Sequence, residues 1–261
     1  MLRNINFMSI SDIRKMGDKK NSNKGKKASK PVRISSGISG FNSLIESGFE
    51  KNSVNLIVGG SGSGKTIFAM HFLVEGISKG ENVLYVTFEE KRTQFFRDMA
   101  QFGWELEKYE NDGNFFFLEY SPEKVREMLE EGGGTVEGIV IKNKITRIVI
   151  DSVTSFALLF EEELKKREAA LALFDIIRKW NCTSLLTLQE EPTERTEGSS
   201  VSLEFEADGI ILLYFVRYKG RRQRFVEVLK MRGTEHSTKI YQFDITGRGI
   251  IISKGVLKEP I

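Results

Sequence analysis

The feature that most constrains this chain is a glycine-rich turn between two apolar segments. Residues 59–66 read GGSGSGKT, after the apolar run VNLIV and before IFAMHFLVEGI. A buried strand, a glycine-rich turn and a helix that opens with Lys and Thr make up the pattern GxxxxGK[ST], in which backbone N–H groups surround phosphate oxygens. The sequence therefore predicts a phosphate-binding loop at the edge of a sheet.

Each part of this loop has an expected role. Glycines keep side chains away from the phosphates, and the start of the helix adds unpaired N–H groups and the positive end of its dipole. Lys65 is expected to reach the β- and γ-phosphates, and the Thr66 hydroxyl to bind Mg²⁺. The expected nucleotide-binding residues are Gly59, Gly60, Ser61, Gly62, Ser63, Gly64, Lys65, Thr66 and Ile67. The pattern fits either ATP or GTP.

Acidic residues follow two other apolar strand-like runs. Asp151 ends RIVID, where a carboxylate can meet Mg²⁺ through its water shell. Glu89 and Glu90 end VTFEE, at the sheet edge where ligands of parallel sheets bind. Either glutamate could orient or deprotonate an attacking water, although acids also suit the first turn of a helix.

A polar residue ends a third strand-like run. Gln189 closes TSLLTLQ and could hydrogen-bond a γ-phosphate oxygen, or it could simply be a polar strand end.

The order of the apolar runs indicates the fold class. Strands and helices alternate as far as residue 189, and strand-like runs separated by short turns follow from residue 209. This order predicts an α/β domain over residues 31–261, with a mostly parallel twisted sheet flanked by helices and a C-terminal antiparallel extension. The segment YKGRR is expected to form a hairpin tip.

The first 30 residues differ in composition from the rest. They carry nine Lys or Arg and two Asp, a net charge of +7, whereas the whole chain has a net charge of +3. With no apolar periodicity, they are expected to form a mobile basic tail that either contacts nucleic acid or another polyanion or serves as a solubilising extension.

Several classes of protein are disfavoured. No apolar run approaches the roughly 18–20 residues that span a membrane, and the N-terminus lacks a secretory pattern. The single Cys182 excludes an internal disulfide. We therefore expect a cytoplasmic protein without a membrane partner.

The run KMRGTEH at residues 230–236 adds a more specific signal. Together with the loop, it makes the chain resemble the RecA superfamily, and within it the KaiC-like and archaeal RadA-paralogue branch. The resemblance covers about residues 32–253 and rests on RISSGISGFNSLIESGF, GGSGSGKTIFAMHFLVEGISKGENVLYVTFEE, RIVIDSVTS, EFEADGIILL and VLKMRGTEHS. It implies a three-layer RecA-like fold, ATP with Mg²⁺, and a homo-oligomer, expected to be a hexameric ring.

The same resemblance implies roles for four further residues. In KaiC-type rings the Lys and Arg of this run reach the γ-phosphate held by the neighbouring subunit, which assigns Lys230 and Arg232 as fingers acting in trans, with Thr234 and His236 nearby. Alternate strand residues point to one face, and cations stabilise a transferring phosphoryl group. The alternative is a basic, exposed strand edge.

The chain departs from clock KaiC at several places. It carries one KaiC-type domain rather than two. Glu204 and Phe205 stand where the second clock domain has its phosphorylated Ser-Thr pair, so self-phosphorylation has no acceptor there. Gly247 replaces the aspartate expected near the base. The chain therefore resembles the ATPase half of KaiC more than its kinase half.

Three functions remain open from the sequence. The first is a ring ATPase with active sites at subunit interfaces, in a regulatory or remodelling role with an unidentified protein partner. The second is a DNA-binding recombination or repair accessory protein that uses the basic tail or residues 217–224, although the acidic loop after Gln189 would repel phosphate. The third is a nucleotide switch with slow or no hydrolysis.

Overall fold

The computed structural model describes residues 31–121, 124, 127, 132, 134–157, 160–192 and 201–257, apart from the side chains of residues 157, 163, 201–203 and 254. Residues 32–261 form one compact unit. The predicted basic tail and most of the loop after Gln189 lie outside the described residues. So does most of the segment PEKVREMLEE at residues 122–131, whose sequence is typical of a helix that begins at Pro122.

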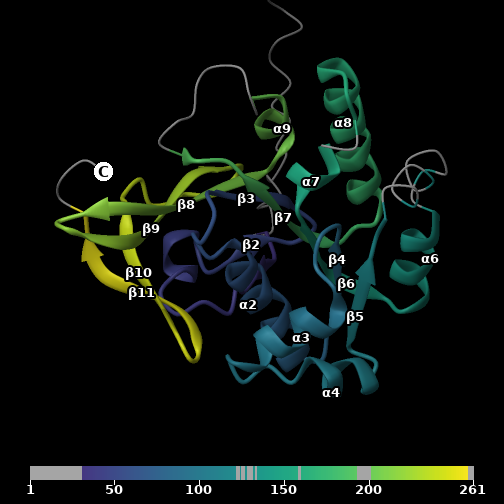
Figure 1. The fold of residues 1–261 in the computed structure, drawn as a ribbon, viewed down its shortest axis with the longest axis horizontal. Coiled ribbons are helices and arrows are strands. Elements are labelled where there is room, and N and C mark those ends of the chain that lie inside the picture. Colours follow the sequence, from purple (N-terminus) through teal and green to yellow (C-terminus); the bar gives the residue numbers. More distant parts are fainter. Residues whose placement is uncertain are drawn as a thin grey trace, which may run out of the picture. The chain divides into compact units, whose positions relative to one another are not determined.

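A nine-stranded mixed sheet forms the centre of this unit, in the order β11-β10-β9-β8-β3-β7-β6-β4-β5 (Figure 1). Across the sheet from β5 through β4, β6, β7 and β3 to β8, each strand runs parallel to its neighbour. Beyond β8, the strands β9, β10 and β11 each run antiparallel to the strand before them. The mostly parallel sheet with an antiparallel extension is thus confirmed. Its strands are β3 (Val54–Gly59), β4 (Asn82–Thr87), β5 (Phe115–Glu119), β6 (Ile145–Asp151), β7 (Thr183–Gln189), β8 (Gly209–Tyr218), β9 (Arg221–Met231), β10 (Tyr241–Thr246) and β11 (Gly249–Val256).

Helices cover both faces of the sheet (Figure 1). On one face lie α2 (Lys65–Ser78), α3 (Arg92–Ala100) and α4 (Leu106–Asn111). On the other lie α6 (Gly134–Lys142), α7 (Val153–Ala157), α8 (Glu163–Lys179) and α9 (Val201–Glu206). A short two-stranded sheet, β1 (Arg33–Ile34) with β2 (Phe49–Glu50), and the 3-10 helix η1 (Asn42–Leu44) precede β3.

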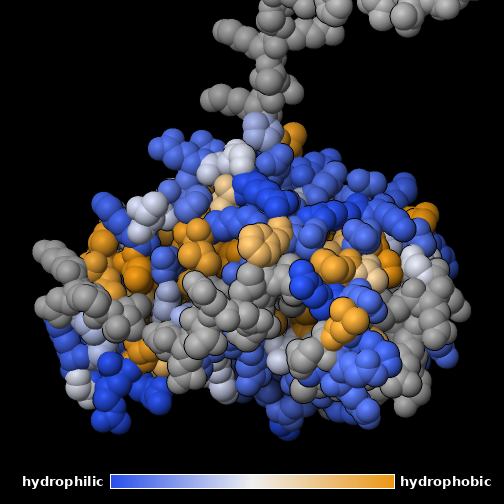
Figure 2. Space-filling model, turned by 90° about the horizontal axis from the view of Figure 1, so that it is seen from above, coloured by the Kyte–Doolittle hydropathy of each residue, from blue (hydrophilic) through white to orange (hydrophobic). Residues whose placement is uncertain are grey.

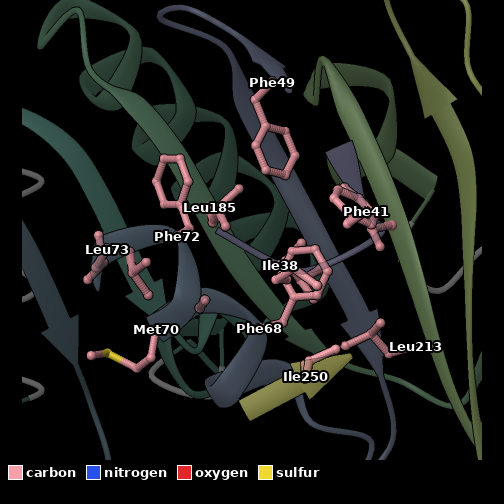
Figure 3. Close-up of a cluster of buried hydrophobic side chains, with 14 of the residues drawn as sticks. Ile38, Phe41, Phe49, Phe68, Met70, Phe72, Leu73, Leu185, Leu213 and Ile250 are labelled. Carbon is pink, nitrogen blue, oxygen red and sulfur yellow. The ribbon is translucent and has the colours of Figure 1, made fainter. Parts of the chain in front are cut away.

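The strand that leads into the glycine-rich loop is buried along its whole length. Val54, Leu56 and Val58 belong to the core under α8, and Ile57 belongs to the core under α2. Two-sided burial explains why this strand reads as a continuous apolar run. In the α2 core, Phe68 meets Phe41 edge to face at 4.9 Å between ring centroids (Figure 3).

Sequence patterning missed four short helices, α4, α6, α7 and α9. The clearest case is α6, whose sequence GTVEGIVIK is rich in glycine and β-branched residues that disfavour helix. Val136 and Val140, four residues apart, are both buried in the core. Tertiary packing of one face therefore overrides weak helix propensity here.

The structure also bears on membrane insertion. None of the helices in the described part of the chain is both long and apolar enough to cross a bilayer.

Candidate functional site

The glycine-rich loop joins the end of β3 to the start of α2, as predicted. Gly62 and Gly64 adopt the left-handed backbone conformation, with φ of 74° and 99°. Gly64 is the residue that caps α2, so the helix begins at Lys65 with its first N–H groups unpaired by any side chain. This geometry gives a concave row of donors facing the position of a bound anion.

The side chains of the loop also fit a triphosphate. Lys65 Nζ donates to the carbonyl oxygens of Gly59 and Gly60, at 2.8 and 3.0 Å. Burial lowers the pKa of Lys65, against the opposing effect of nearby carboxylates. Ser63 Oγ is buried and has no hydrogen-bond partner among the described residues. A cation folded onto its own loop and an unsatisfied buried hydroxyl both suit a polar anion that binds there.

Asp151, at the end of β6, meets the loop helix directly. Thr66 Oγ1 donates to Asp151 Oδ2 at 2.8 Å. Tyr85 OH donates to the same oxygen at 2.7 Å, and Thr187 Oγ1 donates to Oδ1 at 2.6 Å. The peptide bond between Asp151 and Ser152 is cis. A hydroxyl and a carboxylate oxygen are ligands that Mg²⁺ prefers, directly or through water.

The candidate Mg²⁺ site at Thr66 and Asp151 is open rather than a preformed cage. Within the described ranges, no group of three or more His, Cys, Asp or Glu converges to hold a metal ion. Mg²⁺ commonly binds to one or two protein ligands and completes its shell with phosphates and water. The residues present therefore fit Mg²⁺ held together with a nucleotide.

Glu89 and Glu90 follow β4 on the same sheet edge. Thr87, two and three residues earlier, pairs with Asp151 in the sheet, and its hydroxyl accepts both glutamate N–H groups. Desolvation raises the pKa of Glu90 to about 7, with help from the charges of Asp151, Asp98 and Glu89. A carboxyl with a pKa near neutrality suits a general base at neutral pH.

Gln189 also lies at this edge, since it pairs with Gly59 across β7 and β3. Its N–H donates to the Thr154 hydroxyl at 2.7 Å, and its side chain is exposed. The structure thus brings the loop, Asp151, Glu89, Glu90 and Gln189 together at the carboxyl ends of the parallel strands.

Lys230 and Arg232 lie at the other end of the sheet. Lys230 pairs with Ile210, and the Arg232 N–H donates to Asp208 O at 2.7 Å, at the start of β8. The Asp208 N–H in turn donates to Val54 O, five residues before the loop along β3. At about 3.3 Å per residue, Arg232 is roughly 16 Å along the strand from the loop of its own subunit.

The two cations point the same way, as their alternation predicted. Both side chains donate to the carbonyl oxygen of Phe205 at the end of α9, and Lys230 also donates to Glu204 O at 2.8 Å. Arg232 lies 3.5 Å from the Asp208 carboxylate. Burial lowers the pKa of Lys230, and the neighbouring Arg232 adds to this.

Thr234 and His236 lie on the segment that leaves β9. The Thr234 hydroxyl accepts from Arg33 at 2.6 Å, and His236 Nδ1 lies 3.1 Å from Ser237 O. They therefore belong with Lys230 and Arg232, and not with the loop of the same subunit.

The hairpin at residues 217–224 forms as predicted, with its tip between β8 and β9. Arg222 and Arg224 lie over the Phe215 ring, at 5.2 and 4.2 Å from its centroid. Arg224 Nε also donates to Gly62 O at 3.0 Å, so this strand supports the phosphate loop.

Three residues at the loop edge were missed from the sequence: Tyr85, Thr187 and Glu191. The Glu191 carboxylate lies against Gly60 and is one of the negative charges near Lys65. Tyr85 and Thr187 are polar groups within buried strand runs, four residues before Glu89 and two residues before Gln189. Their place in the strands does not mark them, because only the order of the strands in the sheet brings their hydroxyls to Asp151.

Comparisons with known proteins agree with this geometry. The family profile described as "ATPase: KaiC" matches residues 34–256. The circadian clock protein KaiC3 of Synechocystis is 34% identical over 229 residues, which cover 84% of this chain and 45% of that relative. The chain thus spans about half the length of KaiC3.

Two further relatives are similar over nearly their whole length. A UPF0273 protein of Pyrococcus furiosus is 34% identical over 237 residues, covering 84% of this chain and 93% of that protein. The crystal structure of a KaiC-like protein from Pyrococcus horikoshii matches with a TM-score of 0.77 and 37% identity, covering 85% of this chain and 99% of that one. The matched family profile, these relatives and the RecA-like fold place the chain in the KaiC family of ATPases.

Proposed function

We propose that this protein hydrolyses ATP with Mg²⁺ in a head-to-tail homo-oligomer, expected to be a hexameric ring, whose active sites lie between subunits. The phosphate loop, Thr66 and Asp151 hold the Mg²⁺–ATP, and Glu90, helped by Glu89, activates the attacking water. Gln189 contacts the γ-phosphate. Lys230 and Arg232 of the adjoining subunit act on the transferring phosphoryl group, and Thr234 and His236 line the same nucleotide.

The observation that carries this proposal is the separation of the two residue sets within one subunit. Arg232 is level with Val54, whereas the loop follows Gly59 at the far end of the same strand. A side chain spanning about 7 Å does not cover the roughly 16 Å between them along the sheet. The fingers can therefore serve a nucleotide only if it is held by another subunit.

The surface chemistry of the two ends supports a contact between copies. The loop edge carries the carboxylates of Glu89, Glu90 and Glu191, and the finger edge carries Lys230 and Arg232. Phe205 and Leu229, beside the fingers, are 66% and 44% exposed. Figure 2 views the face above α8 and α9 and shows apolar patches among the polar side chains. Complementary charge around exposed apolar groups is typical of an interface.

The hydrolysis rate against protein concentration tests this proposal. The rate per subunit should rise with concentration and then level off, because the active site is complete only after assembly. Arg232→Ala should lower the plateau rate by about 10³-fold or more, as expected for loss of an arginine finger.

Arg178→Ala is the matched control, because Arg178 also pairs with the end of α9 through Glu206. It should keep most of the activity. A rate per subunit that is independent of concentration and insensitive to Arg232→Ala would contradict the proposal, and would favour a self-contained nucleotide switch.

A second candidate function is binding of a nucleic acid through the β8–β9 hairpin. Arg217 and Arg222 face each other across the two strands, and both are exposed, as is Arg221. Like charges directly opposite one another destabilise a hairpin unless a partner anion compensates. Single-stranded DNA binding that weakens steeply with salt, and is lost in Arg217→Ala/Arg221→Ala, would support this candidate, and unchanged binding would exclude the hairpin.

A further inference from the structure

The carboxylate of Asp151 accepts hydrogen bonds from three protein hydroxyls, of which only one belongs to the loop helix. Besides Thr66, it accepts hydrogen bonds from Tyr85 on β4 and Thr187 on β7. We propose that Tyr85 and Thr187 are positioning residues, which fix Asp151 so that it binds Mg²⁺ through the ion's water shell. This proposal rests on the proposed function, since it assumes that the loop binds Mg²⁺–ATP.

The number of hydrogen bonds supports water-mediated contact. An ionised carboxylate offers about four lone-pair positions. Three are occupied, two on Oδ2 by Thr66 and Tyr85 and one on Oδ1 by Thr187. About one position remains. A carboxylate held in this way can accept one hydrogen bond from a metal-bound water, but it is poorly placed to enter the inner shell of the ion.

The position of Tyr85 is fixed by its aromatic surroundings. Its side chain is fully buried, stacks on Phe117 at 5.5 Å and meets Phe95 at 4.5 Å between ring centroids. Burial, together with the Asp151 charge, raises its pKa well above the ordinary value, so the phenol remains a donor. The ring therefore holds a hydroxyl at a defined point beside Asp151.

Thr187 holds the carboxylate from the opposite side. β4 and β7 are the two neighbours of β6, so the two donors flank the strand that ends at Asp151. The Thr187 side chain is fully buried, and Leu186 pairs with Ile150, which places Thr187 level with Asp151. Hydroxyls from both neighbouring strands leave the Asp151 side chain little freedom to rotate. Partners of this kind set the affinity of a metal site.

Binding of a fluorescent, non-hydrolysable ATP analogue to the full-length chain tests the proposal. The affinity is measured in EDTA and across a Mg²⁺ titration. Tyr85→Phe keeps the ring and removes one hydroxyl. It should raise the Mg²⁺ concentration for half-maximal enhancement about tenfold and leave the affinity in EDTA unchanged. Thr187→Val should shift it in the same direction, and Thr187→Ser, which retains the hydroxyl, should stay near wild type.

Tyr214→Phe is the matched control, because Tyr214 is another buried tyrosine that donates to a carboxylate, that of Glu227. It should leave the Mg²⁺ dependence unchanged. Equal Mg²⁺ dependence in wild type, Tyr85→Phe and Thr187→Val would overturn the proposal, as would an equal shift in Tyr214→Phe.

If Tyr85→Phe does not fold, the comparison of Thr187→Val with Thr187→Ser tests the proposal without it. Wild-type protein that binds the analogue without any Mg²⁺ enhancement would instead refute the proposed function, and this result is visible before any variant is made.

Discussion

At the residue scale, adjacent glutamates with the same chemistry differ in their surroundings. Both Glu89 and Glu90 follow β4. Desolvation and the carboxylates of Asp151, Asp98 and Glu89 raise the pKa of Glu90 to about 7. A base with a pKa near the working pH combines a sufficient deprotonated fraction with useful proton affinity. The structure therefore separates two residues that the sequence left equivalent.

This difference predicts a pH profile. Because the base must be deprotonated, kcat/KM at saturating Mg²⁺ should be low in acid and rise with pH through about 7. Glu90→Gln should remove this limb and lower the rate by about 10²–10⁴-fold, whereas Glu89→Gln should keep the limb. A limb that persists in Glu90→Gln would belong to the substrate or to another group.

The loop glycines, Lys65 and Thr66 were predictable because phosphate binding requires these residue types at this spacing. Tyr85 and Thr187 were not, because a tyrosine or threonine within an apolar run is compatible with any buried strand. Only the strand order, which puts β4 and β7 on either side of β6, brings their hydroxyls to Asp151.

At the element scale, α2 both opens at the phosphate loop and ties the antiparallel extension to the core. His71 Nε2 on α2 accepts the Ile250 N–H of β11 at 2.7 Å, and the imidazole packs edge to face on Trp104. The apolar run IFAMHFL around this histidine indicates a packing role, and these contacts agree with it.

His71 makes stability depend on pH. Burial lowers its pKa from 6.5 to about 4, so between these values the unfolded chain binds more protons than the folded one. This contribution to stability is complete above about pH 7 and falls with acidification toward pH 4, by up to about 3 kcal/mol.

Denaturant unfolding at several pH values between 4.5 and 7.5 measures this effect. His71→Gln keeps an acceptor for Ile250 but does not titrate, so it should flatten the curve over this range. His236→Gln changes the chain's other histidine and should retain the wild-type slope. An unchanged slope in His71→Gln would assign the effect to other groups.

The same helix requires a glycine where it crosses β6. A Cβ at Gly76 would lie 2.7 Å from Cδ and Nε of Arg147, a buried guanidinium whose ion pair with Glu81 spans 2.7 Å. Gly76→Ala should therefore lower the free energy of unfolding by about 1–3 kcal/mol, despite the better helix propensity of Ala.

Gly138→Ala in α6 provides the matched comparison, since nothing lies within 4 Å of a Cβ there. It should raise the free energy of unfolding by about 0.5–1 kcal/mol. Denaturant midpoints of the two variants measure both effects. The same sign for both substitutions would contradict this explanation.

Long elements were predictable from the sequence, and short ones were not. The helix that the sequence predicts to open at Lys65 begins there in the structure, because a strand before it and a capping glycine define its start. By contrast, α6 and α9 span nine and six residues, too few for apolar periodicity to be distinctive.

At the scale of the whole molecule, the sheet separates the phosphate loop from the two cations that we propose act on a neighbouring subunit's nucleotide. The nucleotide loop stands at one end of the parallel strands, and Lys230 and Arg232 stand at the other. The resemblance to KaiC implied this arrangement. The sequence of one subunit alone does not specify where a neighbouring subunit would lie. The distance between the two sets is the reason that the proposed mechanism requires a second subunit.

Mixing two inactive variants tests this central claim most directly. Lys65→Ala disables the loop and keeps the fingers, and Arg232→Ala keeps the loop and disables the fingers. If fingers act in trans, an equimolar mixture forms some interfaces with an intact loop from one variant and an intact Arg232 from the other. About a quarter of the wild-type ATPase rate per subunit should return, as random assembly gives. A mixture as inactive as its two components, at a concentration where both variants assemble, would contradict the account.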